Sequence, residues 1–453
     1  MANIKTNIGL LESESFLTTT EKEIFDILRN VCNMYEPPVV ARVVGGWVRD
    51  KLLGIECDDL DISLEGTSGP EFAKNVKFLI DAKIQTNPCQ SEHLESAKIC
   101  LSNDFWIDVC QLRCDEYNED SRIPNIRIGT PEEDSLRRDI TINALFYNIN
   151  TQKVEDFQNG LIDLENKCIR TTYDPLLSFN DDPLRILRAF RFASRFGFNI
   201  CNEIINAAQY SRECFHHKLA KQRIEMELKK ALSGPNPFIY IELLLQSGLF
   251  SEIFDVNNEF NLDIDDIIKR SMIVSKRISN FPDYHYSIAL AVIYYQVYQN
   301  NILVIDPINK RKKIKLLEYA ISRNILSSSD IYNVTNSILQ GSKTVQDIKA
   351  LERVTVGNWI RSTGKLWRYS SLLIFDEEFY SFFEETLVPY IMQENLQNAY
   401  EIVPIINGKE LAKIHNVKPG PIISVLIKRL IDWQLLNPNG TVDDYVNSVN
   451  HSN

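Results

Sequence analysis

At 453 residues the chain is too long for one simple core, so two to four domains are expected. The composition, 44% hydrophobic and 24% charged, is that of a globular protein, and no apolar run approaches the ~18 residues of a membrane span. The net charge of −12 argues against a protein that binds nucleic acid over its whole surface. Between Arg185 and Ser233, however, there are ten basic residues and four acidic ones, which suits local contact with a phosphate backbone.

The start of the chain and its cysteines bear on its compartment. Residues 1–22 contain three glutamates and no arginine, which argues against a secretory signal and against a strong mitochondrial presequence. The nine cysteines are odd in number and form no C-x-x-C motif, so reduced thiols are expected. We expect a cytoplasmic protein that does not enter a membrane. Nucleus and mitochondrion stay open as further locations, and a monomer is favoured.

The first 171 residues carry mixed strand and helix signals. A strand is expected at 39–44, and the helix after it, at 47–54, ends at Gly54. The other elements expected here are a strand at 58–64, a helix at 70–80, strands around a polar loop over 82–112, a turn with proline and acidic residues, a segment at 135–147, and short strands to about 171.

From Asp181 onward the strand signals fade, and apolar residues recur every three or four positions, which predicts helices. A mixed α/β part followed by an all-helical remainder is therefore expected. The helices are predicted at 182–196, 201–213, 221–233, 236–247, 264–278, 284–299, 309–322, 328–340, 378–396 and 418–435.

A glycine pair followed by two spaced aspartates is the most informative stretch of the chain. Gly45 and Gly46 let the backbone approach a phosphate, and the N-terminus of the next helix offers N–H donors to it. In an extended strand, Asp59 and Asp61 point the same way and lie ~7 Å apart. Such a pair suits Mg²⁺, which also takes ligands from substrate phosphates. Together these features predict nucleotidyl transfer rather than a solvated acidic turn.

Asp108 lies in the middle of a predicted strand, in the sequence Trp106-Ile107-Asp108-Val109. A carboxylate among apolar residues is costly unless it is paired or binds a metal. Asp108 either completes the metal site, acts as a base on an incoming hydroxyl, or is a salt-bridged strand residue, and the sequence leaves these readings open.

An Arg-Arg-Asp cluster at 137–139 leads directly into an apolar stretch. Arginine binds phosphate or ribose oxygens in a fixed fork geometry, and a nearby Asp or Asn can bond to sugar hydroxyls. Arg138, Asp139 and Asn143 are therefore candidates for nucleotide binding, with a plain surface ion pair as the alternative.

The helix that begins near Pro183 carries a polar stripe. Pro183 suits a first helical turn, and an aspartate before it can serve as the cap. Asp182, Arg185, Arg188 and Arg191 follow at three-residue steps, so they share a slowly turning face opposite apolar residues. The alternative is an amphipathic helix whose basic face is solvated.

Asp182 and Arg185 can also select bases. Cytosine and adenine each present an amine donor beside a ring-nitrogen acceptor, whereas guanine and uracil present a carbonyl beside an N–H. An adjacent carboxylate acceptor and guanidinium donor would accept C and A and reject G and U. Such a side-chain pair would select nucleotides without a nucleic-acid template.

Taken in order, these motifs resemble the class II tRNA nucleotidyltransferases, the CCA-adding enzymes, and most nearly their yeast type. The similarity is strong over roughly 35–255 and recognisable at 400–440. One departure is that the family's base-selecting motif begins Glu-Asp, whereas this chain has Asp181-Asp182, a conservative change that keeps Asp182. The segments that carry the resemblance are 45–61, 136–145, 155–164, 181–196, 223–232 and 406–433.

The resemblance implies an α+β fold: a polymerase β-like nucleotidyltransferase head followed by a helical neck, body and tail. The reaction would be transfer of CMP and AMP from CTP and ATP to the 3′ end of tRNA. The implied boundaries are 1–34 for an N-terminal extension, 35–172 for the head, 173–255 for the neck with base recognition, 256–400 for the body and 401–453 for the tRNA-binding tail.

The resemblance also implies roles for individual residues. The hinge between head and neck would include Asp156, Asn159 and Gly160, and a loop at about 86–98 would serve addition of the final A. For the site, Asp59 and Asp61 would hold catalytic Mg²⁺, Gly45, Gly46 and Arg49 would contact the triphosphate, Arg138, Asp139 and Asn143 the ribose, Asp182 and Arg185 the base, and Arg188 and Arg191 the triphosphate or the base-selecting pair.

Three alternatives stay open. The chain could be a poly(A) polymerase of the same class, although its acidic balance speaks against this. It could add only CC or only A, in a system of two enzymes. It could also be a tRNA-binding protein without catalysis, against which the intact Asp59, Asp61 and Arg138 argue.

Overall fold

The chain forms two compact units, each with its own core. The first unit comprises Met1–Ala231 and Ile239–Phe250, and the second comprises Leu232–Phe238 and Ser251–Asn453. A computed structural model describes residues 3–57, 59–80, 82–86, 96–101, 105–118, 121–212, 215, 219–255, 259–306, 309–324, 328–348 and 350–450.

The first unit is built on a sheet of seven strands in the order β3-β4-β5-β2-β1-β8-β9. Strands β2 and β5 run parallel, and the other neighbours run antiparallel. The strands are β1 (Val40–Val44), β2 (Leu60–Glu65), β3 (Lys83–Thr86), β4 (Ser96–Cys100), β5 (Trp106–Gln111), β8 (Phe146–Asn148) and β9 (Lys153–Glu155).

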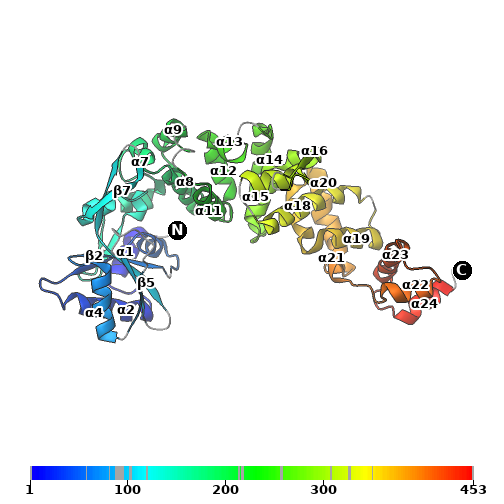
Figure 1. Cartoon of the computed structure of the whole chain (residues 1–453), viewed down its shortest axis with the longest axis horizontal. Helices are drawn as coiled ribbons and strands as arrows, with labels where there is room; N and C mark the ends of the chain where they lie inside the picture. The colour runs from blue at the N-terminus through cyan, green and yellow to red at the C-terminus, as the bar shows by residue number, and fades with distance from the viewer. Residues whose placement is uncertain are drawn as a thin grey trace. The chain divides into compact units, whose positions relative to one another are not determined.

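Helices α2 (Thr19–Cys32) and α4 (Gly69–Ile80) pack against the sheet and against each other (Figure 1). The prediction contained no helix before residue 47, yet α1 (Ile4–Glu12) and α2 are well formed. The N-cap Thr18 and Glu21 form a capping box that starts α2, and Phe25 packs edge-on against Trp47 in the core. Residues 4–32 therefore belong to the core of the head.

A second difference lies after residue 112, where a turn was expected. A hairpin forms there instead, from β6 (Arg113–Asn118) and β7 (Ser121–Ile128), and makes a sheet of its own. Its strands lack the alternation of apolar and polar residues that predicts a strand, so only the pairing itself reveals them. The elements that follow are α5 (Pro131–Leu136), the 3₁₀ turn η2 (Thr141–Asn143), α6 (Gly160–Asn166) and β10 (Cys168–Ile169).

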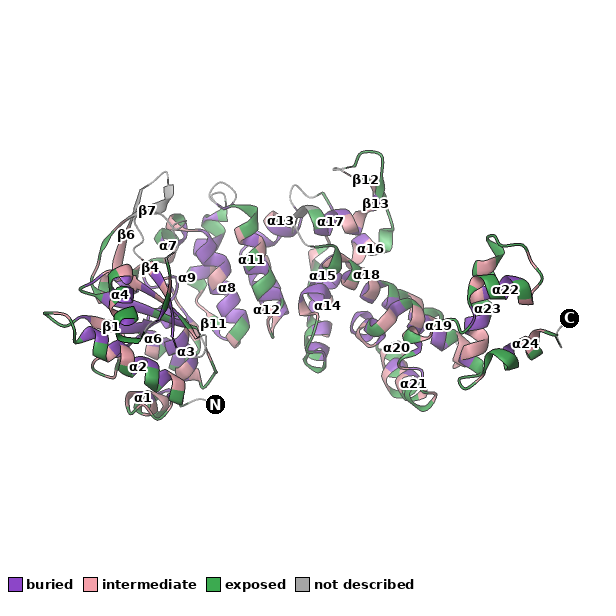
Figure 2. Ribbon diagram, turned by 60° about the horizontal axis from the view of Figure 1, so that its bottom comes forward, coloured by how far each residue is buried: buried purple, intermediate pink, exposed green. Residues whose placement is uncertain are grey.

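The helical part of the first unit agrees closely with the prediction. The predicted helix at 182–196 is α8, Leu184–Phe196, and it ends at Gly197 in the left-handed conformation. Figure 2 shows buried residues along the head strands and along the sides of α8 and α11. The elements here are α7 (Pro175–Asp181), α8, β11 (Asn199–Ile200), α9 (Asn202–Tyr210), α11 (Lys221–Leu232) and α12 (Pro237–Gln246).

The second unit is almost wholly helical. Its helices are α13 (Leu249–Phe254), α14 (Ile264–Arg277), α15 (His285–Ile293), α16 (Tyr295–Asn300), α17 (Leu316–Asn324), α18 (Ser329–Thr344), α19 (Arg353–Thr363), α20 (Glu377–Phe382), α21 (Val388–Gln393), α22 (Gly408–Ile414), α23 (Ile422–Leu436) and α24 (Val442–Asn450). Shorter turns are η4 (Ile278–Asn280), η5 (Val345–Asp347), η6 (Gly364–Leu373), the π-turn η7 (Phe383–Leu387) and η8 (Ala399–Glu401).

Several predictions in the second unit were wrong in part. The predicted helix at 284–299 is divided into α15 and α16, and α22 and α24 were not predicted. The predicted helix at 309–322 begins instead with strand β13 (Lys313–Lys315), because this segment pairs with β12 (Leu303–Ile305). Helix α19 was not predicted, since it contains β-branched residues and Gly357, which favour helix weakly. A Cβ at Gly357 would lie 2.6 Å from Leu435, so close packing against α23 stabilises α19 instead. Among the described residues, no helix is long and apolar enough to cross a membrane.

The corner at Asp156–Gly160 fixes the start of α6. The carboxylate of Asp156 accepts hydrogen bonds from the backbone N–H groups of Gly160 and Leu161, both at 2.9 Å. A Cβ at Gly160 would lie 2.4 Å from the carbonyl oxygen of Thr141, a contact that a side chain cannot make. Whether this corner acts as a hinge stays a prediction.

Replacing Gly160 by alanine should destabilise the head. The new Cβ must push η2 away, and overpacking of this kind costs ~1–3 kcal/mol in the free energy of unfolding. Urea denaturation followed by circular dichroism measures the change. Gly9, on the exposed side of α1 with no atom within 4 Å of an added Cβ, is the matched control. Gly9→Ala should be neutral or stabilising, by up to ~1 kcal/mol. Equal effects at the two positions would contradict the steric argument.

Candidate active site

Strand register gathers the glycine turn and three carboxylates at one end of the sheet. Val44, the last residue of β1, lies opposite Asp61 of β2, and Asp61 lies opposite Asp108 of β5. Asp59 directly precedes β2, and both Asp59 and Asp61 are exposed while the residues between and after them are buried. The expected pair of carboxylates on one side of the chain is therefore present.

The carboxylates repel one another. Desolvation, together with the charges of Asp59 and Asp108, raises the pKa of Asp61 to about 6, against the opposing charges of Arg138 and Lys98. A proton or a cation bound at this point relieves the repulsion. The carboxylates of Asp59 and Asp61 are two hard oxygen donors, a set that fits Mg²⁺. Within the described part of the chain, no three His, Cys, Asp or Glu side chains gather closely enough to hold a metal, so phosphate oxygens would have to complete the coordination.

Asp108 forms an ion pair with Lys98 of β4, with Nζ and Oδ2 3.0 Å apart, and both side chains are half-exposed. The structure therefore shows the salt bridge that was one of the three possibilities for Asp108. Asp108 also lies directly beside Asp61, and its charge acts on that residue. Asp108 can bind a metal or act as a base only if Lys98 is displaced. The catalytic role of Asp108 therefore stays a prediction.

Gly45 and Gly46 join β1 to α3 (Gly46–Leu53). Gly45 adopts φ +74°, a conformation that favours glycine, and no side chain caps the helix. The first N–H groups of α3 are thus available to a phosphate. Arg49, one turn into α3, is buried, and its guanidinium lies 5.0 Å from the ring centre of Phe192 and 4.9 Å from that of Phe196.

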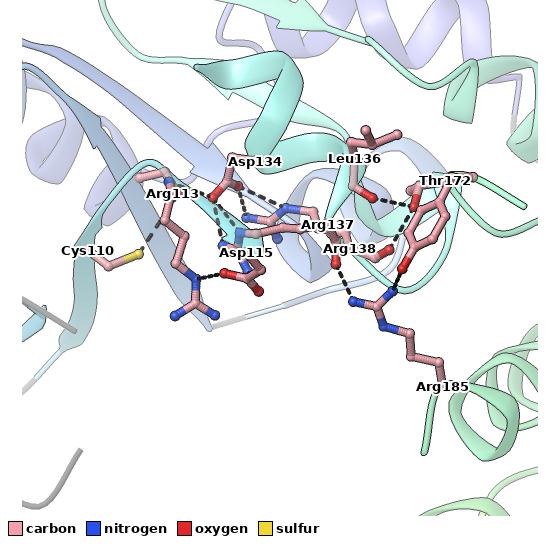
Figure 3. Close-up of polar contacts among 11 residues, drawn as sticks. Cys110, Arg113, Asp115, Asp134, Leu136, Arg137, Arg138, Thr172 and Arg185 are labelled. Carbon is pink, nitrogen blue, oxygen red and sulfur yellow. Dashed lines mark hydrogen bonds and ion pairs between the residues drawn. The ribbon is translucent and has the colours of Figure 1, made fainter. Parts of the chain in front are cut away.

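Asp134, a buried aspartate that was not predicted, anchors the Arg-Arg-Asp cluster. Asp134 is fully buried and accepts hydrogen bonds from Arg137 at 2.7 and 2.9 Å and from Arg138 at 2.8 and 3.2 Å (Figure 3). Although desolvation acts to raise the pKa of Asp134, the two arginines hold it below its usual range. The backbone N–H of Arg113 also donates to Asp134, at 3.3 Å. Asp134 thus fixes Arg138 within reach of Gly45.

Asp139 connects the head to α8. Its carboxylate accepts hydrogen bonds from the backbone N–H of Ile140 at 2.9 Å, from Asn143 at 3.0 Å and from Nε of Arg188 at 2.7 Å. Desolvation opposes the charged form, but Arg188 and the hydrogen bond from Asn143 lower the pKa of Asp139 to about 2. Asn143 in turn accepts a short hydrogen bond from Arg49. Three predicted nucleotide-binding residues are therefore ordered through Asp139.

Asp182 and Arg185, the predicted base-selecting pair, each form hydrogen bonds with different partners. Oδ1 of Asp182 accepts the N–H of Leu184 at 3.1 Å, so Asp182 caps α8 from just before Pro183. Arg185 is buried and donates to the hydroxyls of Tyr173 and Ser178, at 2.6 and 2.9 Å. It also donates to the carbonyl of Arg137 at 2.7 Å, which ties α8 to the head (Figure 3).

The stripe of α8 is not a solvated basic face. Arg191 is 9% exposed, and its Nε donates to Glu227 of α11 at 2.6 Å. Arg188 is one-third exposed and lies 3.8 Å from the same glutamate. The predicted amphipathic pattern is correct, but the polar side is enclosed between α11 and the head.

These side chains line one cavity of about 520 Å³ within the first unit. Its lining includes twelve of the thirteen predicted site residues, and Asp108 is the one that does not contribute to it. Nine arginines and five aspartates line it, so its excess of positive charge suits a triphosphate in an acidic chain. The predicted residues in the lining are Gly45, Gly46, Arg49, Asp59, Asp61, Arg138, Asp139, Asn143, Asp182, Arg185, Arg188 and Arg191.

Several further residues of the lining were not predicted. Arg113 and Asp115 of β6 form an ion pair at 3.2 Å, and Arg137, Arg195 and Arg223 add positive charge. Arg137 and Arg195 stood beside predicted residues, so their charge was a usable signal. Arg113 and Asp115 lie on the hairpin that was expected to be a turn, and only its pairing brings them to the cavity. The loop predicted at about 86–98 lies mostly outside the described residues.

Comparison with known proteins decides the family. A domain described as the poly A polymerase head domain matches residues 41–170, and a probable RNA and SrmB-binding site of polymerase A matches 197–259. A tRNA nucleotidyltransferase of Schizosaccharomyces pombe is 32% identical over 96% of this chain and 98% of its own. This chain belongs to the tRNA nucleotidyltransferases. The enzyme class and the family expected from its motifs are thereby confirmed.

Other members of the family extend the similarity. A CCA tRNA nucleotidyltransferase of Candida glabrata, named as mitochondrial, is 33% identical over 96% of this chain and 95% of its own. Among solved structures, an apo CCA-adding enzyme has a TM-score of 0.71 at 21% identity, and a Thermotoga maritima CCA-adding enzyme complexed with tRNA has 0.69 at 21% identity. Each covers 98% of this chain and is itself covered to 98%. These structures share the fold, and the expected α+β class is confirmed.

The Asp139→Asn variant should lose stability at neutral pH. The pKa of Asp139 lies near 2 in the folded state and near 3.9 when unfolded, so the charged form stabilises the fold by ~2 kcal/mol. This contribution is complete above about pH 4 and is lost as pH falls through about 2. Urea denaturation at neutral pH and near pH 3 should show the difference between variant and wild type shrinking in acid. Asp26→Asn, at an exposed carboxylate, should stay within ~0.5 kcal/mol of wild type at both pH values.

The metal-free Asp61→Asn variant should, by contrast, be more stable than wild type at neutral pH. The pKa of Asp61 is raised in the folded state, so the folded protein holds the proton more tightly than the unfolded chain does. The stability that this gives is complete below about pH 4 and is lost as pH rises through about 6. Because the side chain is solvent-exposed, the gain is discounted to ~1 kcal/mol or less, or ~2–4 °C in Tm. Thermal unfolding with a chelator present measures it. A gain that is larger at pH 4 than at pH 7 would contradict the assigned direction of the shift.

Proposed function

We propose that this enzyme is a CCA tRNA nucleotidyltransferase, which adds C, C and A to the 3′ end of tRNA from CTP and ATP without a nucleic-acid template. The main support is that one cavity is lined by the exposed carboxylates Asp59 and Asp61 and by the base-selecting pair Asp182 and Arg185. A cavity lined by nine arginines provides the charge that a nucleoside triphosphate requires.

Base selection would follow from the hydrogen-bonding character of the two side chains. Asp182 accepts and Arg185 donates, which matches the amine and ring nitrogen of cytosine or adenine. Guanine and uracil would place a carbonyl against the carboxylate, and leave both groups unpaired in an enclosed site. The bonds that Arg185 makes to Tyr173, Ser178 and the Arg137 carbonyl support this role, since they preorganise the donor.

The cavity residues would hold the nucleotide for in-line attack. Gly45, Gly46 and Arg49, with Arg188 and Arg191, would bind the triphosphate through N–H groups and guanidinium forks. Arg138 and Asn143 would contact the ribose, with Asp139 ordering Asn143 and Arg188 rather than binding the sugar alone. The 3′-hydroxyl of tRNA would then form a bond to the α-phosphorus as the bond to the β-phosphate oxygen breaks and pyrophosphate leaves.

A divalent cation fits the carboxylate pair. Asp59 and Asp61 would hold Mg²⁺ together with oxygens of the substrate. When bound, Mg²⁺ stabilises charge on the attacking and leaving oxygens. As a base on the hydroxyl, Asp108 would first have to release Lys98.

The decisive assay uses purified protein, Mg²⁺ and tRNA ending at the discriminator base, with each nucleoside triphosphate alone and in mixture. Growth by C, C and A followed by a stop, read at single-nucleotide resolution, is the expected result. A long ladder of A would identify a poly(A) polymerase. A stop after CC, or a requirement for pre-made CC, would identify one enzyme of a two-enzyme system, and no extension would leave a tRNA-binding protein.

Asp59→Ala should lower the rate of incorporation by roughly a thousandfold, because the cation contributes several kcal/mol to the barrier. Binding of tRNA, measured by filter retention, should stay within about twofold, since the substitution leaves the arginines in place. Asp265→Ala, at an exposed carboxylate on α14, is the matched control and should be fully active. Equal loss in the two variants would argue against the assigned role of Asp59.

We also propose the cytoplasm as the main location, with nucleus and mitochondrion as additional sites of action. Two yeast relatives are named as mitochondrial, which supports the mitochondrial part. Fractionation of cells that carry the tagged protein, with matched marker proteins, distinguishes the three compartments.

A further inference from the structure

The segment at 223–232 belongs to the sequence motifs of the family resemblance, but the predicted roles do not include Arg223. In the structure, α11 presents Arg223 and Glu227 one turn apart toward α8. Arg223 binds Asp182, with NH2 3.1 Å from Oδ2, and Glu227 binds Arg191. A single helix thus contacts both the base-selecting carboxylate and an arginine of the phosphate-binding set.

We propose that Arg223 is a positioning residue that fixes the carboxylate of Asp182 and so determines how strongly C and A are preferred over U and G. This inference rests on the proposed function of the cavity. It adds a third residue to the selecting pair, because Asp182 is bound to Arg223, whereas Arg185 is held by Tyr173, Ser178 and the Arg137 carbonyl.

The geometry of Asp182 shows why its carboxylate needs the bond from Arg223 in addition to the one from the backbone. Asp182 follows the last residue of α7 with an extended backbone, φ −142° and ψ 101°, and lies in the short link between α7 and α8. The N–H of Leu184 holds Oδ1 at 3.1 Å, and Arg223 holds Oδ2 at 3.1 Å. With one oxygen held by each donor, the plane of the carboxylate is defined. A carboxylate accepts about four hydrogen bonds, so acceptor sites remain for the amine of a base.

The charge and exposure of Arg223 suit this position. Its side chain is 36% exposed and lines the cavity, so the guanidinium stands at the wall rather than in the core. The pair with Asp182, whose side chain is 21% exposed, is therefore partly screened and can adjust when a nucleotide enters. Glu227, one turn further on α11, is 4% exposed and anchors the helix through Arg191 at 2.6 Å.

Loss of Arg223 should affect selection more than binding. CTP and UTP share the triphosphate and ribose, so the arginines of the cavity hold both equally. Rejection of uracil depends on a fixed carboxylate opposite its carbonyl. If Asp182 can rotate away, the repulsion falls, and the correct base also loses a well-placed acceptor.

The test compares Arg223→Ala, Arg223→Gln and Arg223→Lys with wild type. For each, kcat/KM is measured with CTP and UTP on tRNA ending at the discriminator base, and with ATP and GTP on tRNA ending in CC. The C-over-U and A-over-G ratios should fall about tenfold or more in Arg223→Ala and Arg223→Gln, in line with loss of a hydrogen bond to a charged group. Arg223→Lys, which keeps the charge, should retain most of each ratio.

Lys221→Ala is the matched control, because Lys221 is an exposed cation on the same helix. Its ratios should equal those of wild type. If Arg223 only stabilised the neck, the variants would lose activity with all four nucleotides equally and their Tm would fall, while both ratios stayed unchanged. Unchanged ratios in Arg223→Gln overturn the inference, even if Arg223→Ala is too unstable to assay.

A double-mutant cycle separates this inference from the proposed function. In an Asp182→Asn background, Arg223→Gln should change the ratios by less than about twofold, since its effect acts through the carboxylate. A full additional loss would show that Arg223 acts elsewhere. If wild type itself fails to add C and A, the proposed function falls, whereas normal wild-type addition with unchanged Arg223 variants refutes only the role of Arg223.

Discussion

The cavity depends on buried carboxylates that keep like-charged arginines together. Arginines placed side by side repel one another, and burial makes that repulsion stronger. Asp134 offsets it for Arg137 and Arg138, Asp139 for Arg188, and Glu227 for Arg191. Because each carboxylate is almost fully enclosed and hydrogen-bonded, it fixes the position of its partner.

The same pairs join parts of the chain that are distant in sequence. Asp139 lies beside η2 of the head and binds Arg188 of α8, while Arg185 of α8 binds the carbonyl of Arg137. Thr172 lies 2.6 and 2.8 Å from the carbonyls of Leu136 and Arg138, so the residues just before α7 also contact the segment of the Arg-Arg-Asp cluster (Figure 3). Helix α8, which carries the predicted base-selecting residue Arg185, is thus set against the head by direct polar contacts within one unit.

At one end of the cavity, by contrast, negative charges lie close together and are not fully offset by positive ones. Asp59 and Asp61 line the cavity there and stand close to Asp108, which is paired with Lys98. Desolvation and then the charges of Asp59 and Asp108 raise the pKa of Asp61. A cluster of this kind costs stability until a cation binds, which is a common trade at sites that handle phosphates. One cavity is therefore lined both by Asp139, whose charge is compensated by Arg188, and by Asp61, a predicted metal ligand that is repelled by its neighbours.

By itself, the sequence determined what depends on local spacing. The Gly45–Gly46 turn, the alternation that exposes Asp59 and Asp61, and the three-residue stripe of α8 could all be read from neighbouring residues, because strand and helix periods set these directions. The family followed from the order of such motifs, and twelve predicted site residues line one cavity.

Only the tertiary structure decided the partners. Asp134 has no sequence signal, since its arginine partners and its complete burial depend on the β6–β7 hairpin and α5 packing together. Asp182 is paired with Arg223, 41 residues away in the sequence. Helices α1 and α2 likewise gain their place from contacts with the head. Ion pairs and packing contacts between distant segments leave no regular spacing in the sequence. They can therefore be identified only from the folded structure.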